Sequence, residues 1–210
     1  MSKIESDNHE IPDQKKGGKS DTVETSSFAS QKEAEDFFEI AKRRLLDVSK
    51  WHSLSGVGSA EFTLTDAHGN PVYRPAKEGD YFQIDLPAAP GTDAGDGYDW
   101  VRVEEIVQKI DAEQHFAELI MRVRPAKNPK DNKNETAHFF KEEATSTFVV
   151  SLHSLEVTGE VHGRNEVPNT QQESALDIVR NAIISISAVL GFSKFQWKKL
   201  AKGFVDKEGF

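Results

Sequence analysis

Four side chains that form hydrogen bonds lie close together in the run VTGEVHGRNEVPN, residues 157–169. They are His162, Arg164, Asn165 and Glu166. The run begins as an alternation of apolar and small residues, which is typical of a strand. In an extended strand His162 and Arg164 lie on the face opposite the two valines, Val157 and Val161. The other two residues then lie at the strand end, where the chain enters the loop before a final helix.

This group has two open interpretations. An imidazole, a guanidinium, an amide and a carboxylate can bind the polar group of a ligand at the mouth of a cavity. They can also fix the turn from the sheet to the last helix, with Arg164 paired to Glu166 or to another carboxylate. We expect the structural role first and ligand binding second, because convergent binding sites are few per protein.

A second set of candidate residues lies on two neighbouring strands. Trp100 and Arg102 fall on one face of the strand that begins near residue 98, and Arg122 falls on the next strand with Arg124. Arginines on adjacent strands can bind a carboxylate or a phosphate. The alternative is a ladder of salt bridges across the strands on a solvent-facing side of the sheet, for which Glu104 supplies a carboxylate.

The loop GTDAGDGYDW, residues 91–100, carries Asp93, Asp96 and Asp99 at intervals of three. Carboxylates on a flexible, glycine-rich backbone suit a hard cation such as calcium, but the spacing is not that of an EF-hand. A mobile loop over a pocket is the alternative, and no metal site is predicted.

Composition excludes several classes of function. The formal net charge of −9 disfavours binding to nucleic acid and to anionic membranes, since both need a basic surface. The chain has no cysteine, which excludes thiol chemistry and agrees with a cytoplasmic location. Its longest apolar stretch is too short to cross a bilayer, so no integral membrane association is expected. Nucleophile and dinucleotide-binding signatures are absent, and no cofactor is predicted.

The chain is predicted to be an α+β protein. Residues 1–27 contain almost no bulky apolar groups and are predicted to be a disordered tail, with TVETSSFAS at 22–30 as a candidate for one more edge strand. Residues 28–210 form a single domain that starts with one helix at about 31–50. Six or seven antiparallel strands follow, at about 59–66, 72–74, 78–86, 98–110, 115–124, 144–154 and 155–163.

Two helices are predicted after the strands. Thr170 and Glu173 have capping-box spacing before a long apolar helical period that includes Ile178, Ala182 and Ile186. A short helix is expected at 194–203, ended by a glycine.

This order of elements resembles the START-like, or helix-grip, superfamily, which includes Bet v 1-like proteins and polyketide cyclases. The matching parts are TVETSSFAS, QKEAEDFFEIAKRRLLDVSKWHSLSG, the strands from Ser59 to Gly163, and QESALDIVRNAIISISAVLGF. The resemblance is one of topology and covers most of residues 21–192. It implies a curved antiparallel sheet that grips a long C-terminal helix, with an apolar cavity between them. It carries over no catalytic residue, and one N-terminal helix is expected where the family has two short ones.

Three functions follow from these patterns. The leading hypothesis is a protein that binds a small hydrophobic or amphipathic ligand, with walls supplied by Phe148, Val150, Leu152, Val157 and the long C-terminal helix. The second is an enzyme of the cyclase, dehydratase or hydrolase type with His162 or Asp99 as base and Arg164 beside it, which requires all three to meet. The third is an interaction module or homodimer that uses the aromatic C-terminal segment.

Overall fold

The structure is a computed structural model that describes residues 11–56, 58–86, 92–131, 134–169 and 194–208. The long helix predicted from residue 170 onward, with its Ile178, Ala182 and Ile186 face, lies outside these residues.

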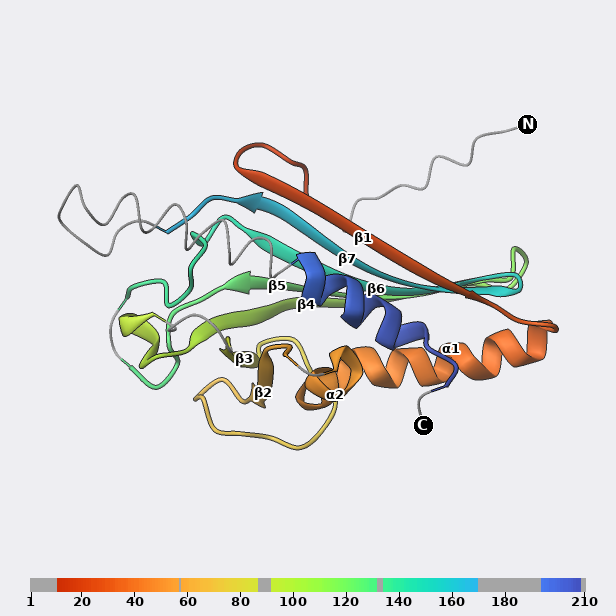
Figure 1. The fold of residues 1–210 in the computed structure, drawn as a ribbon, viewed down its shortest axis with the longest axis horizontal. Helices are drawn as coiled ribbons and strands as arrows, with labels where there is room; N and C mark the ends of the chain where they lie inside the picture. The colour runs from red at the N-terminus through yellow and green to blue at the C-terminus, as the bar shows by residue number, and fades with distance from the viewer. Residues whose placement is uncertain (1–10, 57, 87–91, 132–133, 170–193, 209–210) are drawn as a thin grey trace.

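Seven antiparallel strands form one sheet in the order β1-β7-β6-β5-β4-β3-β2 (Figure 1). The strands are β1 (Gly18–Ser27), β2 (Glu61–Thr65), β3 (Tyr81–Asp85), β4 (Asp99–Asp111), β5 (Phe116–Pro125), β6 (Thr145–His153) and β7 (Glu156–Glu166). Two helices, α1 (Gln31–Leu46) and α2 (Trp51–Ser55), connect β1 to β2. Helices and sheet are segregated along the chain, so the predicted α+β class with a curved antiparallel sheet is confirmed.

Strand β1 corrects the predicted disordered tail, which is wrong for residues 18–27. This strand pairs with β7 along nearly its whole length, from Gly18 beside Glu166 to Ser27 beside Glu156. It needs few apolar side chains because the backbone ladder and polar contacts hold it at the sheet edge. The sequence had offered only TVETSSFAS, residues 22–30, as a candidate edge strand here.

The helical segment after β1 also differs from the prediction. Ser30 caps α1 as expected, its hydroxyl accepting a hydrogen bond from the Glu33 N–H at 3.3 Å. The helix ends at Leu46, and a short 3-10 turn (Val48–Lys50) leads into α2, so one helix over 31–50 is wrong. The indole N–H of Trp51 donates to the carbonyls of Arg44 and Leu45 in the last turn of α1, at 3.1 and 3.2 Å. The break therefore lets Trp51 enter the core.

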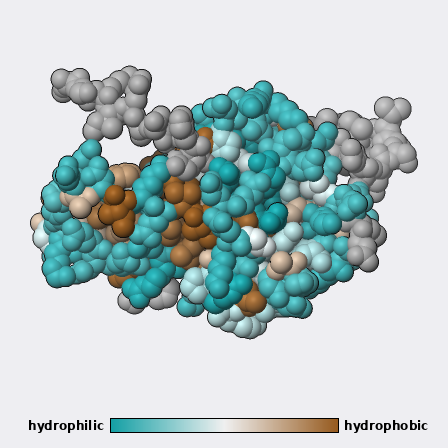
Figure 2. Space-filling model, turned by 180° about the vertical axis from the view of Figure 1, so that it is seen from behind, coloured by the Kyte–Doolittle hydropathy of each residue, from teal (hydrophilic) through white to brown (hydrophobic). Residues whose placement is uncertain are grey.

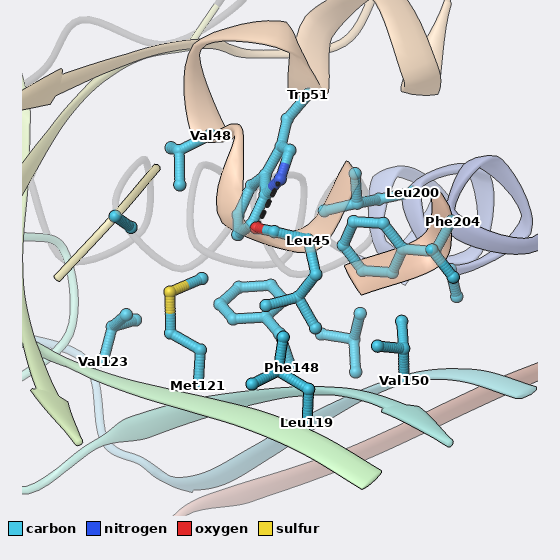
Figure 3. Close-up of a cluster of buried hydrophobic side chains, with 14 of the residues drawn as sticks. Leu45, Val48, Trp51, Leu119, Met121, Val123, Phe148, Val150, Leu200 and Phe204 are labelled. Carbon is cyan, nitrogen blue, oxygen red and sulfur yellow. Dashed lines mark hydrogen bonds between the residues drawn. The ribbon is translucent and has the colours of Figure 1, made fainter. Parts of the chain in front are cut away.

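The core lies between the concave face of the sheet and the helices (Figure 3). Trp51 is fully buried at its centre, and its ring centroid lies 4.6 Å from that of Phe148 and 5.8 Å from that of Phe204. Buried aromatic rings at these distances add to the stabilisation from burial alone.

A C-terminal helix over 194–205 packs across this core, in front of the sheet in Figure 1. It continues two residues past the predicted end because Gly203 lies inside it. A Cβ at Gly203 would lie 2.7 Å from the carbonyl oxygen of Leu54, so the glycine allows the helix to approach α2 closely. Arg44 donates to the carbonyls of Gly203, Phe204 and Asp206 at the helix end. Phe204, which belongs to the aromatic C-terminal segment considered for docking to a partner, packs in the chain's own core. No helix in the described part of the chain is long and apolar enough to span a membrane.

Candidate functional site

A narrow hollow lies on the concave face, at the end of the sheet where β4 begins and β7 ends. Its volume is about 40 Å³. The strands supply Val101, Val123 and Ser146, and the helix over 194–205 supplies Gln196. We call this hollow the cavity.

Phenylalanine and tryptophan side chains make up seven of the fifteen described residues in its wall. Five come from the sheet and the helices: Trp51, Phe62, Phe82, Phe148 and Trp197. Phe139 and Phe140 come from the segment between β5 and β6. Of the walls predicted from the sequence, Phe148 lines the cavity, whereas Val150, Leu152 and Val157 belong to the packed core. Such a wall suits an apolar molecule, with few polar groups to orient it.

Glu166 is the candidate from the HGRNE run that reaches the cavity. Strict alternation would place it on the outer face with His162 and Arg164. Asn165 has a φ of 56°, in the left-handed region, and this breaks the alternation at the strand end. Glu166 then turns inward over Gly163, where a Cβ would lie 2.0 Å from Glu166 Oε1. The bare backbone of this glycine leaves room for the carboxyl group.

The Glu166 carboxyl has an incomplete set of partners. Ser20 Oγ donates to Oε1 at 3.1 Å, and no other hydrogen bond to the carboxyl is present among the described residues. Burial raises the pKa of Glu166, while the hydrogen bond from Ser20 lowers it. Burial is the stronger influence, so Glu166 takes up a proton more readily in this site than it would in water.

Two further polar residues face the cavity. His138 is buried, and its Nδ1 accepts a hydrogen bond from the Phe140 N–H at 2.9 Å. Burial lowers the pKa of His138 to about 3, so the imidazole is neutral and its proton is on Nε2. Ser146 adds a hydroxyl from β6. His138 is thus both buried and part of the cavity wall.

Asp99 is not among the lining residues, but it lies on the same face of β4 as Val101 and opposite Ile84 of β3, which both line the cavity. It is 2% exposed, and no donor in the described residues reaches its Oδ1. Burial raises the pKa of Asp99 to about 7, although a hydrogen bond from the Phe139 N–H lowers it. Asp93 and Asp96 stay in the preceding loop, where Asp96 accepts from Asn128 at 3.1 Å. No cluster of metal-ligating residues occurs in the described ranges.

His162 and Arg164 lie together on the outer face of β7, as the alternation predicted. His162 Nδ1 lies 2.7 Å from Asp21 Oδ1, and Nε2 lies 2.9 Å from Glu160 Oε2. Arg164 Nη2 lies 2.7 Å from the same Asp21 oxygen, and Nη1 donates to the carbonyl of Ser20 at 3.1 Å. We call these four residues, Asp21, Glu160, His162 and Arg164, the β1–β7 clasp. The carboxylate on β1 lies within the predicted tail, so sequence reasoning missed it.

Both nitrogens of His162 face carboxylates, which requires both to carry protons. Burial lowers the pKa of His162, but the hydrogen bonds to Glu160 and Asp21 outweigh burial and raise it overall. Burial likewise opposes ionisation of Asp21, but hydrogen bonds from His162 and Arg164 lower its pKa overall. The β1–β7 clasp is therefore a charged cluster whose members satisfy one another.

Asn165 holds the segment before β1. Its Oδ1 accepts from the N–H groups of Lys15 and Lys16, at 2.8 and 3.2 Å. Its own N–H donates to Gln14 Oε1 at 3.0 Å. The side chain therefore fastens this segment to the end of β7.

The remaining candidates also lie on the outer face. Trp100 is buried under the loops, and its indole N–H donates to the Gly95 carbonyl at 3.3 Å. Arg102 is exposed. Arg122 pairs with Glu104 at 3.3 Å and with Glu105 at 3.0 Å, which is the geometry of the predicted salt-bridge ladder across the strands.

The face of the molecule turned away from the viewer in Figure 1 is mainly hydrophilic around a smaller hydrophobic area (Figure 2).

The predicted constellation of Asp99, His162 and Arg164 is wrong. Asp99 lies on the concave face, whereas His162 and Arg164 lie on the outer face within the β1–β7 clasp. The sheet separates Asp99 from Arg164, and His162 is engaged with Asp21 and Glu160, so the three residues do not meet at one substrate.

No protein-family model and no curated protein matches the chain. Among solved structures it is similar to a Staphylococcus epidermidis protein, at 15% identity over 93% of this chain and 97% of that one, with a TM-score of 0.34. Norcoclaurine synthase from Thalictrum flavum, in complex with dopamine and hydroxybenzaldehyde, shares 10% identity over 92% and 90%, with a TM-score of 0.32. Major latex-like protein 151 from Panax ginseng shares 13% over 83% and 96%, with a TM-score of 0.30.

The described strands and helices have the order expected of the helix-grip topology. This statement rests on the chain's own strand order, with β1 beside β7, and on the two helices between β1 and β2. The TM-scores are too low for the similar structures to say anything about function.

Proposed function

We propose that this protein binds a small apolar or amphipathic molecule in the cavity. The observation that carries the proposal is the aromatic wall next to polar groups that are largely neutral or incompletely paired. An apolar body gains free energy by leaving water, and the few polar groups can orient one end of it. The cytoplasmic location and the homodimer predicted from the sequence stay predictions.

Intrinsic fluorescence offers a direct test. Of the three tryptophans, Trp51 and Trp197 line the cavity, whereas Trp100 lies on the other face of the sheet. A Trp100→Phe variant therefore reports on the cavity alone. Titration with fatty acids, sterols and single-ring aromatic compounds should change its emission for at least one class and raise the melting temperature of the wild-type protein.

Ser146→Phe tests whether binding takes place in the cavity. The new ring would occupy the hollow and should abolish the emission change and the thermal shift. Ser151→Phe is the matched control, because this serine lies on the same strand but on the outer face, opposite Glu118. Equal binding by both variants would place the ligand elsewhere, and no binding of any class to the wild type would overturn the proposal.

A further inference from the structure

We propose that the cavity prefers an amphipathic amine, a ligand with an apolar body and one ammonium group that pairs with Glu166. The inference rests on the proposed function and names the chemistry of its ligand. It follows from which groups in the wall can carry charge and which cannot.

The charges available to a ligand are few. Among the described lining residues, only His138 and Glu166 ionise, and His138 stays neutral because it is buried and bonded to the Phe140 N–H. No lysine or arginine belongs to the described wall. A ligand carboxylate would lose its water and meet an acidic group without a compensating cation, which is unfavourable.

Glu166 has capacity for one more partner. Its carboxyl receives a hydrogen bond only from Ser20 among the described residues, through Oε1. An ammonium group at Oε2 would form a charge-assisted hydrogen bond, which is stronger than a bond between neutral groups. It would also offset the burial that makes ionisation of the empty site unfavourable.

The aromatic wall favours the same ligand. The face of an aromatic ring carries negative charge and attracts cations, most strongly in a site from which water is excluded. Phe139, Phe140 and Trp197 line the cavity together with Glu166. A cation next to this carboxylate thus meets rings as well, and its apolar body continues toward Phe148 and Trp51.

Other charges near Glu166 are engaged or exposed. Arg164 and Asp21 affect its pKa but point to the outer face, where they pair with each other at 2.7 Å. Lys194 also lowers the pKa of Glu166, yet it is exposed at the start of the helix over 194–205. The carboxylate therefore remains the group on which an entering cation would act.

The test compares three ligands that share one apolar body: 4-phenylbutylamine, 4-phenylbutanol and 4-phenylbutyrate. Isothermal titration calorimetry with the full chain at pH 8 should show the amine binding at least about tenfold more tightly than the alcohol, and the acid most weakly. Lowering the pH to 5 should weaken binding of the amine, since Glu166 takes up a proton, and should leave the affinity for the alcohol unchanged.

Glu166→Gln should remove the advantage of the amine and its pH dependence while the alcohol still binds. Glu61→Gln, the same change at an exposed position on β2, should leave all three affinities unaltered. The comparison of amine with alcohol needs only the wild-type chain, so it decides the inference even if the Glu166 variant is unstable. Alcohol binding as tight as amine binding would overturn the inference and leave the proposed function standing. Failure of all three ligands would also overturn the inference, and the fluorescence titration with fatty acids, sterols and aromatic compounds would then decide the proposed function.

Discussion

The two faces of the sheet treat their ionisable residues in opposite ways at the end of β7. On the outer face, His162 and Arg164 share the carboxylate of Asp21, and each charge has a partner within 2.7 Å. On the concave face, Asp99 is buried and Glu166 is partly buried, and neither carboxyl forms an ion pair within the described residues.

The charged residues of the outer face therefore stabilise the fold, whereas the carboxyl groups of the concave face can still form hydrogen bonds with a ligand. The β1–β7 clasp satisfies its own members and fastens the edge strand. Burial raises the pKa of both concave carboxyl groups, which costs stability but leaves hydrogen-bonding capacity for a ligand. Asp99 is the most buried of them and gives the largest expected effect.

Replacing Asp99 with Asn should remove the loss of stability that ionisation of this buried carboxyl group causes. The folded pKa of Asp99 is about 7 and its ordinary value is 3.8. Because the folded state holds the proton more tightly, wild-type stability falls as the pH rises from about 4 to about 7, by about 4 kcal/mol. Urea unfolding at pH 4 and pH 8 should show this loss in the wild type and not in D99N. Asp85→Asn, an exposed position on β3, should retain it, and a D99N curve parallel to the wild type would contradict the cause.

Replacing Asp21 with Ala should lower the free energy of unfolding by disrupting the β1–β7 clasp. It leaves Arg164 and His162 buried with less compensation, which is costly when one partner of a buried pair is removed. Since Asp21 is itself 39% exposed, we expect about 2–3 kcal/mol of lost unfolding free energy in urea. Asp36→Ala removes a carboxylate from an exposed pair with Lys32 and should cost about 0.5 kcal/mol or less. Equal losses would show that the β1–β7 clasp adds nothing beyond a surface ion pair.

His162→Gln should have a smaller and pH-dependent effect, on the order of 1 kcal/mol. The folded pKa of His162 is raised, so its stabilisation is complete below the unfolded value near 6.5 and is lost as the pH rises through the folded value. The difference in unfolding free energy between wild type and variant should therefore shrink above pH 6.5. His153→Gln, an exposed position on β6, serves as control, and a difference that grows with pH would reverse the assignment.

Periodicity predicted most of the fold. The faces of His162 and Arg164 followed from strand alternation, which depends only on backbone geometry. The inward turn of Glu166 did not, because it depends on the left-handed conformation of Asn165, which alternation does not anticipate.

Contacts between distant segments were the harder part. The partner of Arg164 lies more than 140 residues earlier in the chain, in a segment whose composition indicated disorder. The break after Leu46 was missed because the helical period continues through it, and it is the indole of Trp51 that stabilises the break.

The pairing of β1 with β7 has a consequence for synthesis of the chain on the ribosome. At about 5–20 residues per second, β1 waits on the order of 10 s or longer for its partner strand to be made. An apolar strand left without a partner for that time invites association with other chains, whereas serine, threonine and charged side chains resist it. The polar composition of β1 thus suits a segment that leaves the ribosome early and finds its place late.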